Sequence, residues 1–307
     1  GGAILPFYDA LSQSTQIQHV LARHEQGGGF MAQGMARATG EVAVCLASSG
    51  PGATNLVTAI ADAKLDSIPL VAITGQVPRS MIGTDAFQEV DIYGMSIPIT
   101  KHNFLVGSAE ELLTVIPQAF RLAASGRPGP VLIDIPKDVQ NQRIEVGAWP
   151  EPGRADAVAA PNADLVTQAA AMINAAERPL LYLGGGVVHS GASAQAVELA
   201  EKASLPTVMT LMALGGMPVD HPLSLGMLGM HGARCTNFAL DECDLLIAVG
   251  ARFDDRATGK VAAFCPQARI IHIDIDPAEL DKIKTAHIGI TADVQESLKI
   301  GRASCRE

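Results

Sequence analysis

Glu25 is the residue of this sequence whose surroundings point most directly to chemistry. It lies in the stretch ARHEQGGGFMAQGMARATG (22–40), a helix start that is otherwise small, apolar and rich in glycine. An acid in the first turn of a helix often only complements the helix dipole, which contributes roughly 0.3–1 kcal/mol. The glycines that follow cost helix propensity and are useful where another molecule approaches the backbone closely. Glu25 is therefore a candidate for a carboxylate beside a bound apolar cofactor.

Further candidates in the first half lie at expected strand ends. The run SGPGATN passes through Pro51 into a helix start, with Asn55 one turn in. Such a turn presents N–H groups to a ligand, or it is an ordinary strand-to-helix connection. The connection GQVPRSMIGTDAFQE holds Phe87 and Gln88, and α/β sheets carry sites in connections of this kind.

In the second half, three strand ends have residues that suit a nucleotide. A strand ends in three glycines (184–186), ARFDDR (251–256) follows another, and IDIDP (273–277) ends a third with acids that suit ribose hydroxyls. The run GMLGMHG (226–232) can pack a flat ring or simply fill core. No GxGxxG follows an expected strand, so these signals favour a dinucleotide without the usual fingerprint.

These candidates must be positioned by alternating strands and helices. The pattern predicts, for the first half, strands near 16–23, 42–47, 69–75 and 129–135 and helices near 25–39, 52–64 and 109–125. For the second half it predicts strands in RPLLYLGGG, PTVMT, DLLIAVG and ARIIHIDID and helices near 192–204 and 277–285, with the chain stopping before a closing helix could be completed. The fold class is therefore α/β, with two open, mainly parallel sheets joined by a Pro-, Ala- and Gly-rich linker at 146–162.

Composition restricts the class of partner. With 22 basic against 32 acidic residues the net charge is −10, which argues against nucleic acid or an anionic membrane as a partner. The apolar runs are of strand length, well short of a membrane span. The five cysteines are scattered without CxxC spacing, which predicts a reducing cytoplasm and neither a metal cage nor a disulfide framework.

Both ends of the chain are expected to be incomplete. The chain starts at Gly1 without Met, and the last eight residues (300–307), which include Cys305, lose the preceding helical pattern. We expect the native frame to end near Lys299 and the tail that follows it to be non-native.

Taken together, the motifs resemble one family. RHEQG, SGPGATN, ITGQVPRSMIGTDAFQE, ITKHNFLV, SGRPGPVLIDIPKD, MLGMHG and GARFDDR occur in the order found in the catalytic large subunit of acetohydroxyacid synthase (acetolactate synthase), with the strongest likeness to the bacterial isozyme I type. The resemblance covers Gly1 to about Lys299. It implies a pyrimidine-binding domain at 1–145 that lacks its extreme N-terminus, the linker at 146–162 and a C-terminally truncated central FAD-binding domain at 163–299. The family's third domain, which binds thiamine diphosphate through Mg²⁺, is expected to be absent.

The resemblance also implies roles for single residues. Glu25 matches the glutamate that contacts N1′ of the thiamine aminopyrimidine, Pro51 and Asn55 would lie near that ring, and Phe87 and Gln88 would line the reaction cavity. Lys137 and Arg256 match residues of the substrate channel. The residues implied for a non-redox FAD are Arg127, Gly184, Gly185, Gly186, Leu211, Met212, Leu228, Gly229, His231, Gly250, Arg252, Asp254, Asp274, Ile275, Asp293 and Val294.

The implied activity is the condensation of two 2-keto acids with loss of CO₂, in branched-chain amino acid biosynthesis. Pyruvate and 2-ketobutyrate are the implied substrates, a homodimer or higher oligomer would share the thiamine diphosphate site, and a regulatory small subunit is an implied partner. The isolated chain is expected to be inactive. Alternatives are a pyruvate oxidase-type thiamine enzyme with a redox-active flavin, an NAD-dependent dehydrogenase and an inactive nucleotide-binding module.

Overall fold

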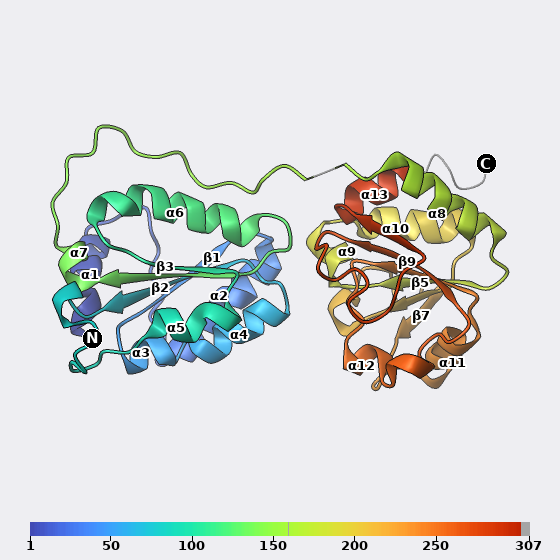
Figure 1. The fold of residues 1–307 in the computed structure, drawn as a ribbon, viewed down its shortest axis with the longest axis horizontal. Helices are drawn as coiled ribbons and strands as arrows, with labels where there is room; N and C mark the ends of the chain where they lie inside the picture. The colour runs from blue at the N-terminus through green and yellow to red at the C-terminus, as the bar shows by residue number, and fades with distance from the viewer. Residues whose placement is uncertain (159, 302–307) are drawn as a thin grey trace. The chain divides into compact units, whose positions relative to one another are not determined.

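The computed structural model describes residues 1–158 and 160–301 of the chain. The chain divides into two compact units, Gly1–Ala157 and Val158–Glu307, and each has its own sheet (Figure 1). Every strand pair in both sheets is parallel. The predicted α/β class with two open parallel sheets is therefore confirmed. Most of the tail at 300–307, including Cys305, lies outside the described residues.

The first unit is built on a four-stranded sheet in the order β1-β2-β4-β3. Its strands are β1 (Ala43–Ala47), β2 (Leu70–Gln76), β3 (His102–Leu105) and β4 (Pro130–Pro136). Its α-helices are α1 (Leu5–Ser12), α2 (Glu25–Thr39), α3 (Pro51–Thr54), α4 (Val57–Leu65), α5 (Ile92–Ser96), α6 (Ala109–Ala124) and α7 (Lys137–Gln140).

Helices cover both faces of this sheet, which explains the continuous apolar runs of its central strands. Every residue of β4 is buried, as expected for a parallel strand between two helical layers. Helices α2, α4 and α5 pack on one face through residues such as Ala36, Ile60 and Ile92, and α6 packs on the other through Ala119 and Ala123 (Figure 1).

The second unit is built on a six-stranded sheet in the order β10-β9-β8-β5-β6-β7. Its strands are β5 (Pro179–Leu183), β6 (Thr207–Met209), β7 (Ser224–Met227), β8 (Leu245–Val249), β9 (Arg269–Asp274) and β10 (Ile288–Thr291). Its α-helices are α8 (Ala163–Ala175), α9 (Gly185–His189), α10 (Ser193–Ala203), α11 (Arg234–Glu242), α12 (Asp255–Thr258) and α13 (Val294–Gly301). One core lies between the sheet and α8, α10 and α13, and a second lies on the other face, around Tyr182 and Phe253.

The described residues between α7 and α8 form neither helix nor strand. The later part of this segment lies on α6, where Arg121 Nη1 is 3.0 Å from Asp156 Oδ1 and the Asp156 N–H donates to Ser125 Oγ. Trp149, in the earlier part, is 79% exposed.

Two expectations about elements are wrong. Residues 16–23 form no strand, and Ile17, Val20 and Leu21 are exposed instead of pairing with β1. Residues 277–285 form no helix, and Asp281 adopts a left-handed backbone conformation with a φ of 59° that would interrupt a helix across this range. Val294 and Leu298 of α13 belong to the core of the second unit, beside the sheet.

Candidate functional site

Glu25 lies at the first position of α2 and is paired with Asn55. The His24 side chain caps the helix by accepting from the Gln26 N–H, and this fixes where α2 begins. Asn55 Nδ2 donates to Glu25 Oε2 over 3.0 Å. Burial alone raises the pKa of Glu25, but the Asn55 hydrogen bond, the residue's own N–H and nearby His24 outweigh it, so the pKa lies below its ordinary value. The carboxylate is therefore ionised at neutral pH.

The turn from β1 into α3 brings backbone close to this carboxylate. A Cβ placed on Gly52 would lie 3.4 Å from Glu25 Oε1 and 3.4 Å from Ser48 Cβ. Gly50 has a φ of 61°, and a Cβ there would lie 2.8 Å from the Gln88 carbonyl oxygen. Within the described structure, Ser48 Oγ is buried without a hydrogen-bond partner. The turn thus joins Glu25 to Gln88 and leaves one buried hydroxyl unsatisfied between them.

Gln88 and Lys137 complete this edge of the first sheet, and Phe87 points away from the protein. A Cβ on Gly1 would lie 2.4 Å from Ser48 Oγ and 3.4 Å from Gln88 Oε1. One on Gly2 would lie 3.9 Å from Lys137 Nζ. Phe87 is 88% exposed, and Pro51 is exposed at the start of α3. The first unit therefore brings Glu25, Asn55 and Gln88 to the glycine turn, while Phe87 and Pro51 are exposed beside it.

Arg127 lies at the opposite edge of the sheet. It precedes β4, and its Nε donates to Ser67 Oγ, which lies just before β2. The residues before parallel strands share the amino edge, whereas Glu25 and Gln88 lie at the carboxyl edge. Arg127 is thus placed in the first unit, while the other residues expected to contact FAD belong to the second.

An ionised carboxylate, an unsatisfied hydroxyl and a side-chain-free turn fit the aminopyrimidine of thiamine diphosphate. Such a ring offers nitrogen atoms to polar partners and a flat face to small residues. Glu25 and Ser48 supply the polar atoms, and Gly52 supplies the open backbone. The arrangement can hold a heteroaromatic ring and exchange a proton with it.

Sequence reasoning missed a buried acid near this edge. Asp134, in β4, is 1% exposed and accepts from Thr74 Oγ1 over 2.8 Å and from Gln76 Nε2 over 3.0 Å. Burial raises the pKa of Asp134 to about 7, with Asp91 adding to the rise and the two hydrogen bonds opposing it. The signal in the sequence is an acid inside the otherwise apolar run VLIDIP.

In the second unit, the other residues expected to contact FAD lie where strands end. They fall after or at the carboxyl ends of β5 (Gly184, Gly185, Gly186), β6 (Leu211, Met212), β7 (Leu228, Gly229, His231), β8 (Gly250, Arg252, Asp254), β9 (Asp274, Ile275) and β10 (Asp293, Val294). Because the strands are parallel, these residues share one edge of the sheet. The strand order reverses between β5 and β8, which is where open α/β sheets place ligands.

The glycines at this point let the two central connections touch. A Cβ on Gly184 would lie 2.1 Å from the Gly250 carbonyl oxygen, and one on Gly186 would lie 2.7 Å from Gly250 Cα. The Gly186 N–H donates to the Gly250 carbonyl over 3.0 Å. Glycine is therefore required at these positions by the packing of the two connections against each other. Gly250 also adopts a φ of 55°, which favours glycine.

Several residues expected to contact FAD also have structural roles at this edge of the second sheet. Leu228 and Val294 are core side chains. Asp254 caps α12 by accepting from the N–H groups of Arg256 and Ala257, and Asp293 accepts from the Glu296 N–H at the start of α13. A Cβ on Gly229 would lie 2.3 Å from the Arg256 carbonyl oxygen. Arg256 itself is exposed, and its Nε lies 3.8 Å from Asp255 Oδ2.

Buried His272 lies beside Asp274 at the end of β9. Its Nε2 is 2.9 Å from the Ala251 carbonyl oxygen and 4.0 Å from Asp274 Oδ2. Burial lowers the pKa of His272, so the ring is neutral and donates to the carbonyl. The Asp274 carboxylate also accepts from the Asp276 N–H. These contacts fix the strand end at which a ribose could bind.

The same edge offers an apolar surface and an unsatisfied hydroxyl that fit a flavin nucleotide. Leu211 and Met230 are 70% and 64% exposed after β6 and β7. Among the described residues, Thr210 Oγ1 is buried without a hydrogen-bond partner just before Leu211. A flat ring can cover the apolar side chains, and a polar atom of the nucleotide can satisfy the hydroxyl.

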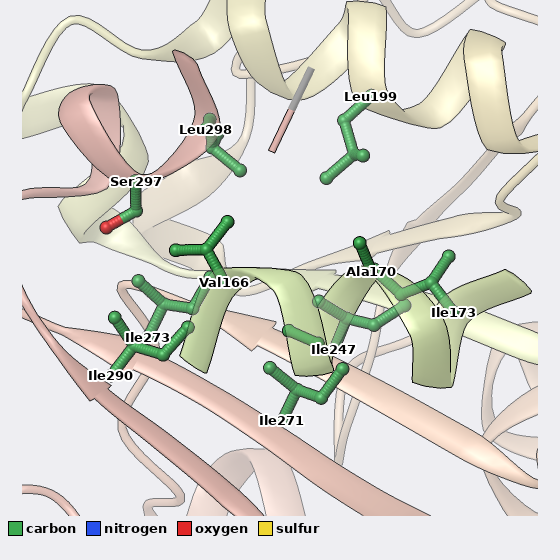
Figure 2. Close-up of a pocket in the computed structure, with 11 residues that line it drawn as sticks. Val166, Ala170, Ile173, Leu199, Ile247, Ile271, Ile273, Ile290, Ser297 and Leu298 are labelled. Carbon is green, nitrogen blue, oxygen red and sulfur yellow. The ribbon is translucent and has the colours of Figure 1, made fainter. Parts of the chain in front are cut away.

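A small cavity in the second unit is part of the core. It has a volume of about 30 Å³ and lies between the sheet and α8, α10 and α13, lined by Val166, Ala169, Ala170, Ile173, Leu199, Ile247, Ile271, Ile273, Ile290, Ser297 and Leu298 (Figure 2). Its one polar lining residue, Ser297, already donates to the Asp293 carbonyl. A void of this size and polarity is a packing gap.

Neither a metal cluster nor a spanning helix is found in the described part of the chain. No group of three or more His, Cys, Asp or Glu side chains among residues 1–158 and 160–301 could hold a metal ion. In the same ranges, no helix combines the length and apolar character needed to cross a membrane.

Comparison with known proteins gives two family matches. Residues 1–95 match the family described as thiamine pyrophosphate enzyme, N-terminal TPP binding domain, and residues 166–300 match the thiamine pyrophosphate enzyme central domain.

Similar proteins cover nearly all of this chain. It is 68% identical to the acetolactate synthase isozyme 1 large subunit of Escherichia coli, over 97% of this chain and 53% of that protein. It is 54% identical to the acetolactate synthase large subunit of Corynebacterium glutamicum, over 97% and 48%. It is 51% identical to a probable acetolactate synthase large subunit of Methanocaldococcus jannaschii, over 97% and 51%. The chain thus spans about half the length of these relatives.

Proposed function

Since this chain belongs to the family of acetolactate synthase large subunits, we propose that it serves the condensation of two 2-keto acids with loss of CO₂. The products would be 2-acetolactate and 2-aceto-2-hydroxybutyrate, precursors of valine and isoleucine. The observation that carries the proposal is the Glu25–Asn55 pair beside the glycine turn. The names of the relatives favour this activity over that of a pyruvate oxidase.

The first unit would hold the aminopyrimidine of thiamine diphosphate. Glu25 would hold a hydrogen bond to N1′ and exchange a proton there, with Pro51 and Asn55 beside the ring. When bound, thiamine diphosphate supplies the electron sink for the carbanion chemistry. Phe87, Gln88 and Lys137 would line the path of the 2-keto acids, since the Lys137 ammonium suits an incoming carboxylate. Arg256 of the second unit would have the same task as Lys137.

The second unit would bind FAD, without net redox, along the edge from β10 to β7. The exposed Leu211 and Met230 side chains and the unsatisfied Thr210 hydroxyl support this assignment. We assign 1–145 to the pyrimidine-binding domain, 146–162 to the linker and 163–299 to the FAD-binding domain. Mg²⁺ would accompany the diphosphate, and we assign it no ligand among the described residues.

The proposed partners follow from this assignment. Pyruvate and 2-ketobutyrate would be the substrates, a second large subunit would complete the thiamine diphosphate site, and a regulatory small subunit would bind in the cytoplasm.

A hybrid enzyme tests the proposal. This chain would replace the matching residues of the Escherichia coli isozyme 1 large subunit, and acetolactate formed from pyruvate would be measured with thiamine diphosphate, Mg²⁺ and FAD present. We expect turnover, and a loss of roughly 10²–10⁴-fold in Glu25→Gln, the range of general acid–base catalysis. The control is Glu41→Gln, at an exposed position of the same unit. Flavin reduction by pyruvate at the rate of turnover would instead show an oxidase.

A further inference from the structure

The connection from β2 to α5 is fixed to the fold at both ends. Gln76 Nε2 donates to the Val90 carbonyl over 2.8 Å, and Gln76 Oε1 accepts from the Val77 N–H over 2.9 Å. Arg79 Nε donates to Asp138 Oδ2 over 2.7 Å, which ties the connection to α7. The residues between these anchors, 80–89, carry Phe87 and Gln88 and form no regular strand.

One carboxylate organises the middle of this connection. The Glu89 side chain accepts hydrogen bonds from the backbone N–H groups of Gly83, Thr84 and Ala86, the last two over 3.2 and 3.1 Å. The Gly83 bond lowers the pKa of Glu89 most, and together with the bonds from Ala86, Thr84 and Asp85 it outweighs the raising effect of burial. Glu89 is therefore ionised, and its carboxylate accepts hydrogen bonds from several N–H groups of its own loop.

This segment has a backbone that needs such support. Asp85 and Gln88 have φ values of 56° and 61°, in the left-handed region that residues with side chains rarely adopt. Conformations of this kind persist where surrounding contacts hold them, and they occur often at functional sites. The Glu89 carboxylate supplies such contacts, because its hydrogen bonds lie within residues 83–89.

The resulting shape sets the positions of two residues of the proposed site. Gln88 lies against the turn at Gly50, where any side chain would meet the Gln88 carbonyl oxygen at 2.8 Å. Phe87 projects into solvent with 88% of its surface exposed. A relaxed loop would release Gln88 from the turn and allow Phe87 to fold onto the protein surface.

We propose that Glu89 is a positioning residue, whose carboxylate holds the 83–88 backbone so that Gln88 meets the glycine turn and Phe87 faces the reacting 2-keto acids. This role rests on the proposed function. Glu89 is not among the residues assigned to contact substrate or cofactor, and it acts through the loop that presents Phe87 and Gln88.

The loop itself is tested in this chain by amide hydrogen exchange. In Glu89→Ala, the Gly83, Thr84 and Ala86 amides should exchange at least about tenfold faster, because their acceptor is gone. Glu89→Gln keeps one acceptor oxygen at the same reach and should give intermediate rates. Glu41→Ala is the control, and strands β2 and β4 should keep their protection. Unchanged exchange in Glu89→Ala, or loss of protection throughout the first unit, would overturn the role.

The consequence for catalysis is tested in the hybrid enzyme. Glu89→Ala should lower turnover of pyruvate by about tenfold or more, the effect of a misplaced site residue, while the thiamine diphosphate concentration for half activation stays within about twofold. Glu89→Gln should recover part of the turnover. Unchanged turnover, or equal losses of turnover and cofactor affinity, would overturn the positioning role alone. A wild-type hybrid without acetolactate formation would overturn the proposed function, while hydrogen exchange still decides the loop contacts.

Discussion

Asp134 makes the stability of the first unit depend on pH near neutrality. Its carboxyl lies inside β4 with 1% of the residue exposed, and it accepts side-chain hydrogen bonds from Thr74 and Gln76. Burial raises the pKa of Asp134 from 3.8 to about 7. The folded state therefore binds this proton more tightly than the unfolded chain does.

The sign and size of the effect follow from this pKa. For a raised pKa, the stabilising contribution is fully present below the unfolded value near pH 4 and is lost as the pH rises through 7. Between pH 5.5 and 8 the loss from Asp134 comes to about 2 kcal/mol at 1.36 kcal/mol per pKa unit. That corresponds to about a 30-fold change in the opening equilibrium of the unit.

Hydrogen exchange of β2 and β4 measures this loss, because these buried strands exchange when the unit opens. The chain and its Asp134→Asn variant would be compared at pH 5.5 and 8, after correction for intrinsic exchange rates. The free energy of opening should fall with pH by about 2 kcal/mol more in the wild type than in the variant. Asp9→Asn, at an exposed position of α1, is the control. The same pH response in wild type and Asp134→Asn would refute the argument from burial.

Three further predictions concern single contacts. Asn55→Ala should raise the pKa of Glu25 toward its ordinary value, as followed by NMR of the carboxyl carbon, because it removes a hydrogen bond that lowers this pKa. Gly184→Ala should destabilise the second unit by roughly 2 kcal/mol in urea unfolding, since its Cβ would meet backbone at 2.1 Å, whereas Gly289→Ala meets only the end of the Leu280 side chain. Val166→Ile should stabilise that unit by up to about 0.7 kcal/mol by filling the cavity of about 30 Å³, and a lower unfolding midpoint would contradict this.

The sequence predicts those elements whose pattern is set by burial on both faces. The runs of β2, β4, β5, β8 and β9 are apolar because helices cover both sides of each sheet, and their positions match the prediction. The run at 16–23 has similar apolar residues, but it pairs with no strand and leaves Leu21 75% exposed. Apolar composition alone therefore cannot distinguish a paired strand from an exposed segment.

The same limit applies to the candidate site. Residues such as Asn55 and Gln88 could be predicted because each follows a strand, and parallel strands bring their carboxyl ends to one edge. The Glu89 contacts could not be predicted from the sequence, because they depend on a folded loop with two residues in the left-handed region. The Asp134 environment also depends on the register of β2 against β4, which places Thr74 directly opposite it. Sequence motifs thus identify the carboxyl edge of the sheet as the place of the site. The surroundings of a charged side chain there depend on which strands and loops contact each other in the folded structure.

The position of Trp149 gives this chain a fluorophore outside both sheets. The chain has one tryptophan, and it lies 79% exposed in the segment between α7 and α8. Denaturant should therefore leave its emission maximum close to that of an indole in water, even while the two cores unfold. A blue shift on adding thiamine diphosphate, FAD or a partner subunit would instead show that this segment becomes covered. Intrinsic fluorescence of this chain is thus an assay of what binds to the connecting segment, and folding must be followed by other means.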